Sequence, residues 1–256
     1  MKIAVTGKGG VGKSTIVALM ARILRDSGKS VLAIDADPDM NLATILGVPE
    51  STTITPIIEL KELIAERTGT EVGKSAPFFT MNPKVDDIPE KYCVEYEGLK
   101  ILTMGTVTKG GGGCACPENA FLKQLLSHLV LLRKEWVLVD MEAGIEHLGR
   151  GTAIGVDEML VVVEPSQASL ETAQRVEKLA GDIGIKKMRV IGNRVQDEAE
   201  KDFLRTNLSG IDILGFLDYS KEMRKINMKL ASALTIDAPP VAQMREMLTQ
   251  AGWMNN

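Results

Sequence analysis

Residues 7–15 read Gly7-Lys8-Gly9-Gly10-Val11-Gly12-Lys13-Ser14-Thr15, and this stretch decides the fold of the chain. An apolar run, Ile3-Ala4-Val5, precedes it, and a helical apolar pattern over residues 16–24 follows it. The sequence therefore predicts a strand, a glycine-rich turn and a helix, which is the setting of a phosphate-binding loop. Glycines let the backbone point successive N–H groups at an anion, and the positive end of the helix adds to the attraction.

The pattern G-x-x-x-x-G-K-[ST] also predicts what the loop binds. Lys13 is expected to reach the β- and γ-phosphates of ATP, and the Ser14 hydroxyl is expected to ligate Mg²⁺. The alternative is a glycine-rich turn without a ligand. The residues expected to bind ATP or ADP in this loop are Gly9, Gly10, Val11, Gly12, Lys13, Ser14 and Thr15.

Length and composition limit the remaining possibilities. The 256 residues fit one α/β domain, and a formal charge of −4 gives no general affinity for nucleic acid or an anionic membrane. No apolar run approaches the roughly 18 residues that cross a bilayer. The start Met1-Lys2-Ile3 leads straight into the first strand, so we expect no signal peptide and a cytoplasmic protein. Three cysteines argue against a disulfide framework.

The rest of the chain alternates strand and helix patterns. This alternation predicts a mainly parallel central sheet covered by helices on both faces, in a single domain over residues 1–256. Residues 68–97 break the alternation, and we expect an insertion over the nucleotide side or at an interface. The expected strands are 30–34, 99–104, 136–140, 159–165, 188–194 and 211–217, and the expected helices are 40–46, 54–67, 117–134, 169–183, 221–230 and 241–251.

Acidic residues follow two of these strands. The motif Asp35-Ala36-Asp37-Pro38-Asp39 comes directly after strand 30–34, where ligands bind in open α/β sheets. Asp35 is expected to assist the water shell of the metal, although capping of the next helix is an alternative for these acids, above all for Asp39. Asp140 ends a hydrophobic strand in the Walker B arrangement and is expected to hold Mg²⁺ through water.

Two cysteines one residue apart lie between a glycine run and a predicted helix. Cys114 and Cys116 can present both sulfurs to one metal, and the helix end favours the thiolate. Thiolates suit zinc, monovalent copper and square-planar nickel. Because two ligands do not complete a site, a symmetric dimer would supply four thiolates across its axis. Inert cysteines or a redox pair are alternatives. Cys93 and His128 are better interpreted as structural residues.

Lys8 gives the loop a second lysine, which resembles the deviant Walker A motif of the MinD/ParA/nitrogenase-iron-protein group of ATPases. The resemblance implies that Lys8 crosses a dimer interface to the partner's nucleotide, a role suited to a cation that stabilises a transferring phosphoryl group. It also implies that Asp37 orients the attacking water and that Asn193, followed by a basic residue, binds the adenine edge. Residues 141–147 resemble the conformational switch of the group.

These motifs together with the Cys-x-Cys pair and Ala143-Gly144-Ile145-Glu146-His147 resemble the CooC/AcsF-type nickel-insertion ATPases. Glu142 departs from the small residue expected there. The resemblance implies an ATP-hydrolysing metallochaperone that dimerises on binding nucleotide or metal, with Ni²⁺ or Zn²⁺ at the interface. Its client would be carbon monoxide dehydrogenase or acetyl-CoA synthase. Two alternatives are an iron–sulfur electron-transfer ATPase and a positioning ATPase.

Overall fold

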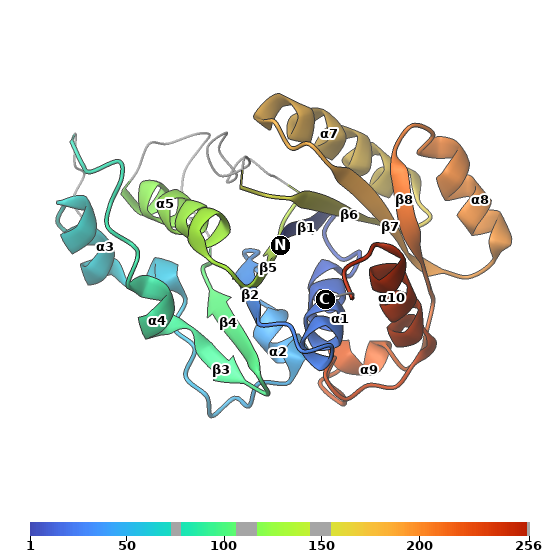
Figure 1. Cartoon of the computed structure of the whole chain (residues 1–256), viewed down its shortest axis with the longest axis horizontal. Helices are drawn as coiled ribbons and strands as arrows, with labels where there is room; N and C mark the ends of the chain where they lie inside the picture. Colours follow the sequence, from blue (N-terminus) through green and yellow to red (C-terminus); the bar gives the residue numbers. More distant parts are fainter. Residues whose placement is uncertain (73–77, 106–116, 144–154, 255–256) are drawn as a thin grey trace.

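A single eight-stranded sheet runs through the computed structural model, in the order β3-β4-β2-β5-β1-β6-β7-β8 (Figure 1). The structure describes residues 1–72, 78–105, 117–143 and 155–254. Every described pairing is parallel except that of β3 with β4. The strands are β1 (Lys2–Gly7), β2 (Val31–Ala36), β3 (Val94–Tyr96), β4 (Leu99–Thr103), β5 (Trp136–Met141), β6 (Glu158–Val163), β7 (Met188–Val195) and β8 (Asp212–Asp218).

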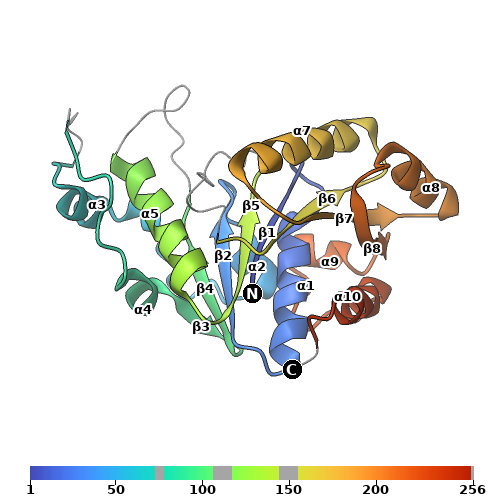
Figure 2. The same cartoon turned by 45° about the horizontal axis from the view of Figure 1, so that its top comes forward.

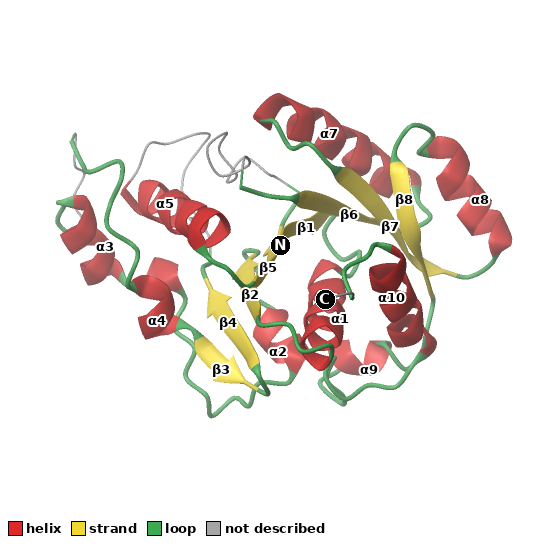
Figure 3. Ribbon diagram, in the orientation of Figure 1, coloured by secondary structure: helices red, strands yellow, loops and turns green. Residues whose placement is uncertain are grey.

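Helices lie on both faces of this sheet, as Figures 2 and 3 show, which confirms the predicted mainly parallel α/β architecture. None of them in the described ranges is both long and apolar enough to span a bilayer. The α-helices are α1 (Lys13–Asp26), α2 (Leu42–Leu46), α3 (Lys61–Thr68), α4 (Ile88–Tyr92), α5 (Pro117–Leu132), α7 (Gln167–Ile183), α8 (Glu198–Asn207), α9 (Arg224–Asn227) and α10 (Pro239–Gln250), and a short 3-10 helix, η1, spans Ile57–Glu59.

Alternating residues of the central strands divide the core between the two faces. In β1, Ala4 packs in a cluster with side chains of α5 and α7, whereas Ile3 and Val5 pack with α1, α2 and α10. This division follows from the strand backbone, in which successive side chains point to opposite faces. Because both faces are buried, β1 and β2 are continuous apolar runs, as the sequence predicted.

The structure corrects the prediction for residues 54–67. The predicted helix is divided into η1 and α3, because Leu60 leaves the helical conformation at φ −76° and ψ 60°. The backbone N–H of Ile58 donates instead to the carbonyl of Met104, at 3.0 Å. A hydrogen bond to a residue distant in sequence thus interrupts the helix that the apolar spacing predicted. The predicted helix 221–230 is likewise shortened to α9, and α8 was not predicted.

Residues 68–97 were predicted to form an insertion over the nucleotide side or at an interface. Their described part forms α4 and the edge strand β3, and Arg67 donates to both carboxylate oxygens of Asp87, at 3.1 and 2.9 Å. The preceding helix α3 contacts α5. None of the described residues of 68–97 lines the two hollows beside the glycine loop. The described part therefore does not support a place over the nucleotide side, and the alternative place at an interface stays a prediction.

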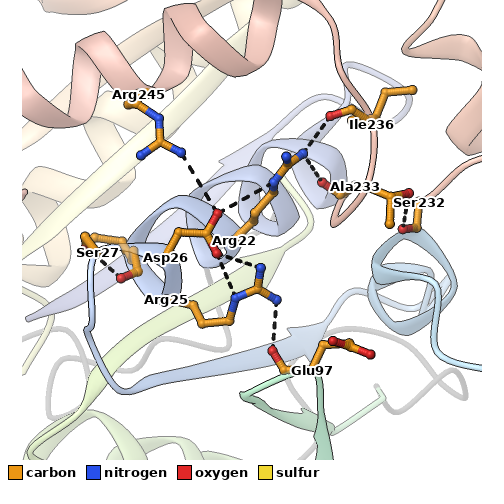
Figure 4. Close-up of polar contacts among 11 residues, drawn as sticks. Arg22, Arg25, Asp26, Ser27, Glu97, Ser232, Ala233, Ile236 and Arg245 are labelled. Atoms are coloured by element: carbon orange, nitrogen blue, oxygen red, sulfur yellow. Dashed lines mark hydrogen bonds and ion pairs between the residues drawn. The ribbon is translucent and has the colours of Figure 1, made fainter.

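Two arginines fix the end of α1 that lies far from the glycine loop (Figure 4). Arg22 donates from one nitrogen to the carbonyls of Ala233 and Ile236, at 3.2 and 2.6 Å. Arg25 donates to the carbonyl of Glu97, at 2.9 Å, in the turn between β3 and β4. Both contacts bind α1 to segments distant in sequence, and they hold the helix that begins at Lys13.

Replacement of Arg22 by alanine is expected to destabilise the protein. The carbonyls of Ala233 and Ile236 would lose a charged donor, which costs about 1.5–3 kcal/mol. Urea unfolding followed by circular dichroism measures the change. Arg245→Ala is the control, because Arg245 lies at 4.0 Å from Asp26 and is half exposed, and it should change stability by less than about 0.5 kcal/mol. Equal effects of the two variants would contradict the anchoring role of Arg22.

Candidate functional site

The loop between β1 and α1 contains two glycines in the left-handed region, Gly10 at φ +83° and Gly12 at φ +97°. Gly12 directly precedes the first residue of α1. A Cβ at Gly12 would also lie 2.6 Å from the amide nitrogen of Asn193. Backbone conformation and close approach thus both require glycine at this position, as expected where a backbone turns its N–H groups toward an anion.

Lys13 begins α1 and is buried, and its ammonium group lies 3.2 Å from a carboxylate oxygen of Asp37. The other oxygen of Asp37 accepts a hydrogen bond from the backbone N–H of Asp39, at 3.1 Å. The structure thereby brings together two residues that the sequence singled out separately. Lys8 is exposed and makes no ion pair with any residue that the structure describes.

Asp35 is fully buried at the end of β2 and shapes the turn that follows. Its oxygens accept hydrogen bonds from the backbone N–H groups of Asp37 and Leu42, at 3.2 and 2.9 Å. Burial raises the pKa of this carboxyl to about 6, although the two hydrogen bonds oppose the shift. Asp35 therefore holds the turn, and its role in the water shell of the metal stays a prediction.

Asp140 is fully buried on β5, directly opposite Asp35 on β2. Neither of its oxygens accepts a hydrogen bond of regular geometry within the described chain. Burial raises its pKa to about 7, and the nearby Ser14 hydroxyl and Lys13 ammonium group offset only part of that effect. A buried carboxylate without a donor suits a hydrated divalent cation, so the residues present fit Mg²⁺.

Two adjoining hollows surround the glycine loop. The loop hollow is lined by residues 9–15 of the loop except Val11, by the turn after β2 and by residues 142 and 143 after β5. The Tyr219 hollow lies between the start of α1, the end of β7 and the segment after β8. The residues that line both hollows are Gly12, Thr15, Arg194 and Asn227.

Asn193 lies on β7 and lines the Tyr219 hollow. Its amide nitrogen donates to the carbonyl of Val11, at 2.7 Å, so one of its two amide hydrogens fixes the glycine loop. Because a carbonyl can only accept, this bond also sets which end of the amide is nitrogen. The predicted site residue therefore joins the loop to the second hollow.

Several polar residues that line a hollow, or that fix a residue lining one, were missed by the sequence reasoning. Gln243 of α10 accepts from the backbone N–H of Asp218, at 3.0 Å, and donates to its carboxylate, at 2.7 Å, which fixes the end of β8. Lys229 lines the loop hollow and pairs with Glu50, at 2.9 Å. No local motif marks these side chains, whereas Arg194 could have been found as the basic residue after Asn193.

The predicted metal ligands Cys114 and Cys116, together with His147, lie outside the described residues. Within the described ranges no group of three or more His, Cys, Asp or Glu side chains is arranged to hold a metal ion. Burial raises the pKa of Cys93 to about 11, and its side chain packs against the core. Cys93 is thus a structural residue, as predicted.

Comparison with known proteins identifies the relatives of the chain. Residues 2–231 match the family model described as the CobQ/CobB/MinD/ParA nucleotide binding domain. The chain is 49% identical over 226 residues to the carbon monoxide dehydrogenase accessory protein CooC of Rhodospirillum rubrum, covering 88% of this chain and 86% of that protein. It is 42% identical over 250 residues to an uncharacterized ATP-binding protein of Methanocaldococcus jannaschii, with 96% of each covered.

Solved structures share the fold at lower sequence identity. A chain of the MinC:MinD cell division protein complex of Aquifex aeolicus superimposes with a TM-score of 0.69 at 24% identity, over 98% of this chain and 95% of that one. MinD of Pyrococcus horikoshii, solved with Mg-ADP, gives a TM-score of 0.65 at 20% identity, over 98% and 96% of the two chains. These matches confirm the predicted P-loop fold.

The raised pKa of Asp140 predicts how stability of the metal-free protein depends on pH. Between the ordinary pKa of 3.8 and about 7 the folded state holds a proton that the unfolded state lacks, so this carboxyl destabilises the fold progressively as the pH rises through that window. Asp140→Asn is therefore expected to increase stability at pH 8 and to change it little at pH 4. The pKa difference sets a ceiling of about 4 kcal/mol.

Urea unfolding in EDTA at both pH values measures this effect. Asp212→Asn is the matched control, because Asp212 is exposed on β8, and it should not reproduce the stabilisation at pH 8. If Asp140→Asn is less stable than the wild type at pH 8, the ionised Asp140 does not destabilise the fold, and the prediction is wrong.

Proposed function

The chain belongs to the CobQ/CobB/MinD/ParA nucleotide-binding family and is an ATPase of the CooC type, and from this membership we propose where it binds ATP and what the hydrolysis serves. The glycine loop holds the β- and γ-phosphates in the loop hollow, and the base enters the Tyr219 hollow. This proposal is supported above all by the ion pair between buried Lys13 and Asp37, at 3.2 Å, beside the buried Asp140, whose oxygens accept no hydrogen bond of regular geometry from the described residues.

Each residue of this proposed site has a chemical role. Lys13 releases Asp37 when phosphate oxygens take its place, since a triphosphate carries more charge than one carboxylate. Asp37 is then available to orient the attacking water. Ser14 and Asp140 hold Mg²⁺, which neutralises charge on the phosphate oxygens when it is bound. The backbone of residues 9–15 binds the phosphates, and Asn193 fixes the loop beside the base.

The second part of the proposal concerns dimerisation. Lys8 is exposed at the rim of the loop and makes no ion pair among the described residues, which suits a lysine that reaches another subunit. A cation supplied in trans stabilises charge that develops on a transferring phosphoryl group. We propose that ATP closes a homodimer in which each Lys8 completes the site of its partner.

The third part concerns the metal and the client. The similarity to the R. rubrum accessory protein, at 49% identity, supports a role in maturing carbon monoxide dehydrogenase or a related nickel enzyme such as acetyl-CoA synthase. We propose that Cys114 and Cys116 of both subunits bind Ni²⁺ or Zn²⁺, and that ATP binding and hydrolysis change the affinity of this shared site. ATP can do so only through its different affinity for the open and closed dimers.

The role of Lys8 predicts complementation between two inactive variants. Lys8→Ala is expected to bind ATP with nearly unchanged affinity but to lose ATPase activity by about 100-fold or more. Asp37→Asn is expected to be equally inactive. An equal mixture should recover up to about one quarter of the wild-type activity, because half the dimers are mixed and each has one complete site. A mixture that stays inactive would place Lys8 in its own subunit's site.

The metal site predicts a stoichiometry. Anaerobic equilibrium dialysis of the full chain with nickel or zinc should give half a metal per chain, together with a dimer on size-exclusion chromatography. Both should be lost in Cys114→Ser/Cys116→Ser, whereas Cys93→Ser, which changes only a core residue, should retain them. Unchanged metal binding in the double variant would refute the assignment, and an iron–sulfur chromophore would favour the electron-transfer alternative.

A further inference from the structure

Arg194 lies near the end of β7 with its backbone in the left-handed region, at φ +59°. This conformation is uncommon for a residue other than glycine, and such strain persists where the surrounding structure requires it. The preceding Asn193 points its amide into the glycine loop. The left-handed backbone of Arg194 gives its side chain a different direction from the one that an extended strand would impose.

Arg194 borders both hollows of the proposed nucleotide site. Among the described residues it is the one charged residue that does so, since the other members of the shared rim are Gly12, Thr15 and Asn227. If the loop hollow takes the β- and γ-phosphates and the Tyr219 hollow takes the base, the α-phosphate crosses this rim. A guanidinium group is well suited to a phosphate there.

Glu164, which directly follows β6, is the acid that faces Arg194. One guanidinium nitrogen lies 3.5 Å from a carboxylate oxygen of Glu164, a distance too long for a strong ionic hydrogen bond. Both side chains are partly exposed, at 42% and 31%, so solvent screens the attraction. Glu164 does not line either hollow. The pair therefore holds Arg194 weakly, at the edge of the site.

We propose that Arg194 binds the α-phosphate of a nucleoside di- or triphosphate and that Glu164 competes with the nucleotide for this guanidinium group. The inference rests on the proposed nucleotide site and adds a binding residue to it. A surface ion pair without a role in binding would predict no effect of either side chain on nucleotide affinity. The competition instead predicts effects of opposite sign for the two partners.

Isothermal titration calorimetry of the full chain with ADP, AMPPNP and adenosine tests the proposal. Arg194→Gln keeps a Cβ and most of the side-chain length but removes the charge. It should weaken the binding of ADP and of AMPPNP to the same extent, by about 10-fold. Adenosine, which has no phosphate, should bind the variant and the wild type equally. Glu164→Gln should strengthen the binding of ADP by about 2- to 5-fold. The double variant should match Arg194→Gln.

Turnover provides a second readout. Because the α-phosphate contact is the same in substrate and transition state, Arg194→Gln should raise KM for ATP and leave kcat unchanged. Arg205→Gln is the matched control for the lost positive charge, since Arg205 is also paired and about half exposed but lies on α8 away from both hollows. It should bind ADP as the wild type does.

Three results would overturn the inference: unchanged ADP affinity in Arg194→Gln, weaker binding in Glu164→Gln, or a loss confined to AMPPNP, which would indicate the γ-phosphate. Lys13→Ala separates this failure from failure of the proposed site. If Lys13→Ala abolishes ADP binding while Arg194→Gln does not weaken it, only the role of Arg194 is wrong. If Lys13→Ala binds ADP normally, the nucleotide site itself lies elsewhere.

Discussion

The contact between Lys13 and Asp37 is the interaction on which the rest of the site depends. One buried ammonium group faces Asp37 at 3.2 Å and also acts on Asp35 and Asp140, whose pKa values burial raises to about 6 and about 7. Three acids and one base do not balance inside a protein, because each unpaired charge loses its hydration. A divalent cation offsets this excess of negative charge, which is a physical reason for a polyanionic nucleotide to enter the site with its cation and not alone.

The parallel sheet makes this unfavourable cluster possible. Asp35 and Asp140 lie opposite each other on β2 and β5, and the glycine loop leaves the neighbouring strand β1 at the same end. The hydrophobic clusters on both faces stabilise the strands, and Arg22 and Arg25 hold the far end of α1. The helix that begins with Lys13 therefore has little freedom to move its first turn away from the acids.

Adjacent residues of β7 contribute to the site in different ways. Asn193 donates to the carbonyl of Val11 and so fixes the loop, whereas Arg194, with its backbone in the left-handed region, lies at the rim shared by the two hollows. The weak pair with Glu164 leaves that guanidinium group available for exchange. In this arrangement the strand end both shapes the loop and supplies a cation for the nucleotide.

Much of the fold could be predicted from the sequence, because the glycine loop and the buried strands are marked by local patterns of residue type. Where the prediction was wrong, a contact between distant residues overrode the local pattern. Ile58 donates to Met104 and interrupts a predicted helix, and the short strand β3 exists only because β4 offers it an edge. Periodicity within a segment carries no information on such partners.

The same distinction holds for the site. The sequence by itself pointed to Lys13 and Asp140 through local motifs, and to Asp37 and Asn193 through the family resemblance. Only the tertiary structure decided that Arg194 borders both hollows, that Gln243 fixes the end of β8 and that the described residues of 68–97 line neither hollow. The physical reason is that strand order brings together residues far apart in the chain, and no local pattern encodes that order.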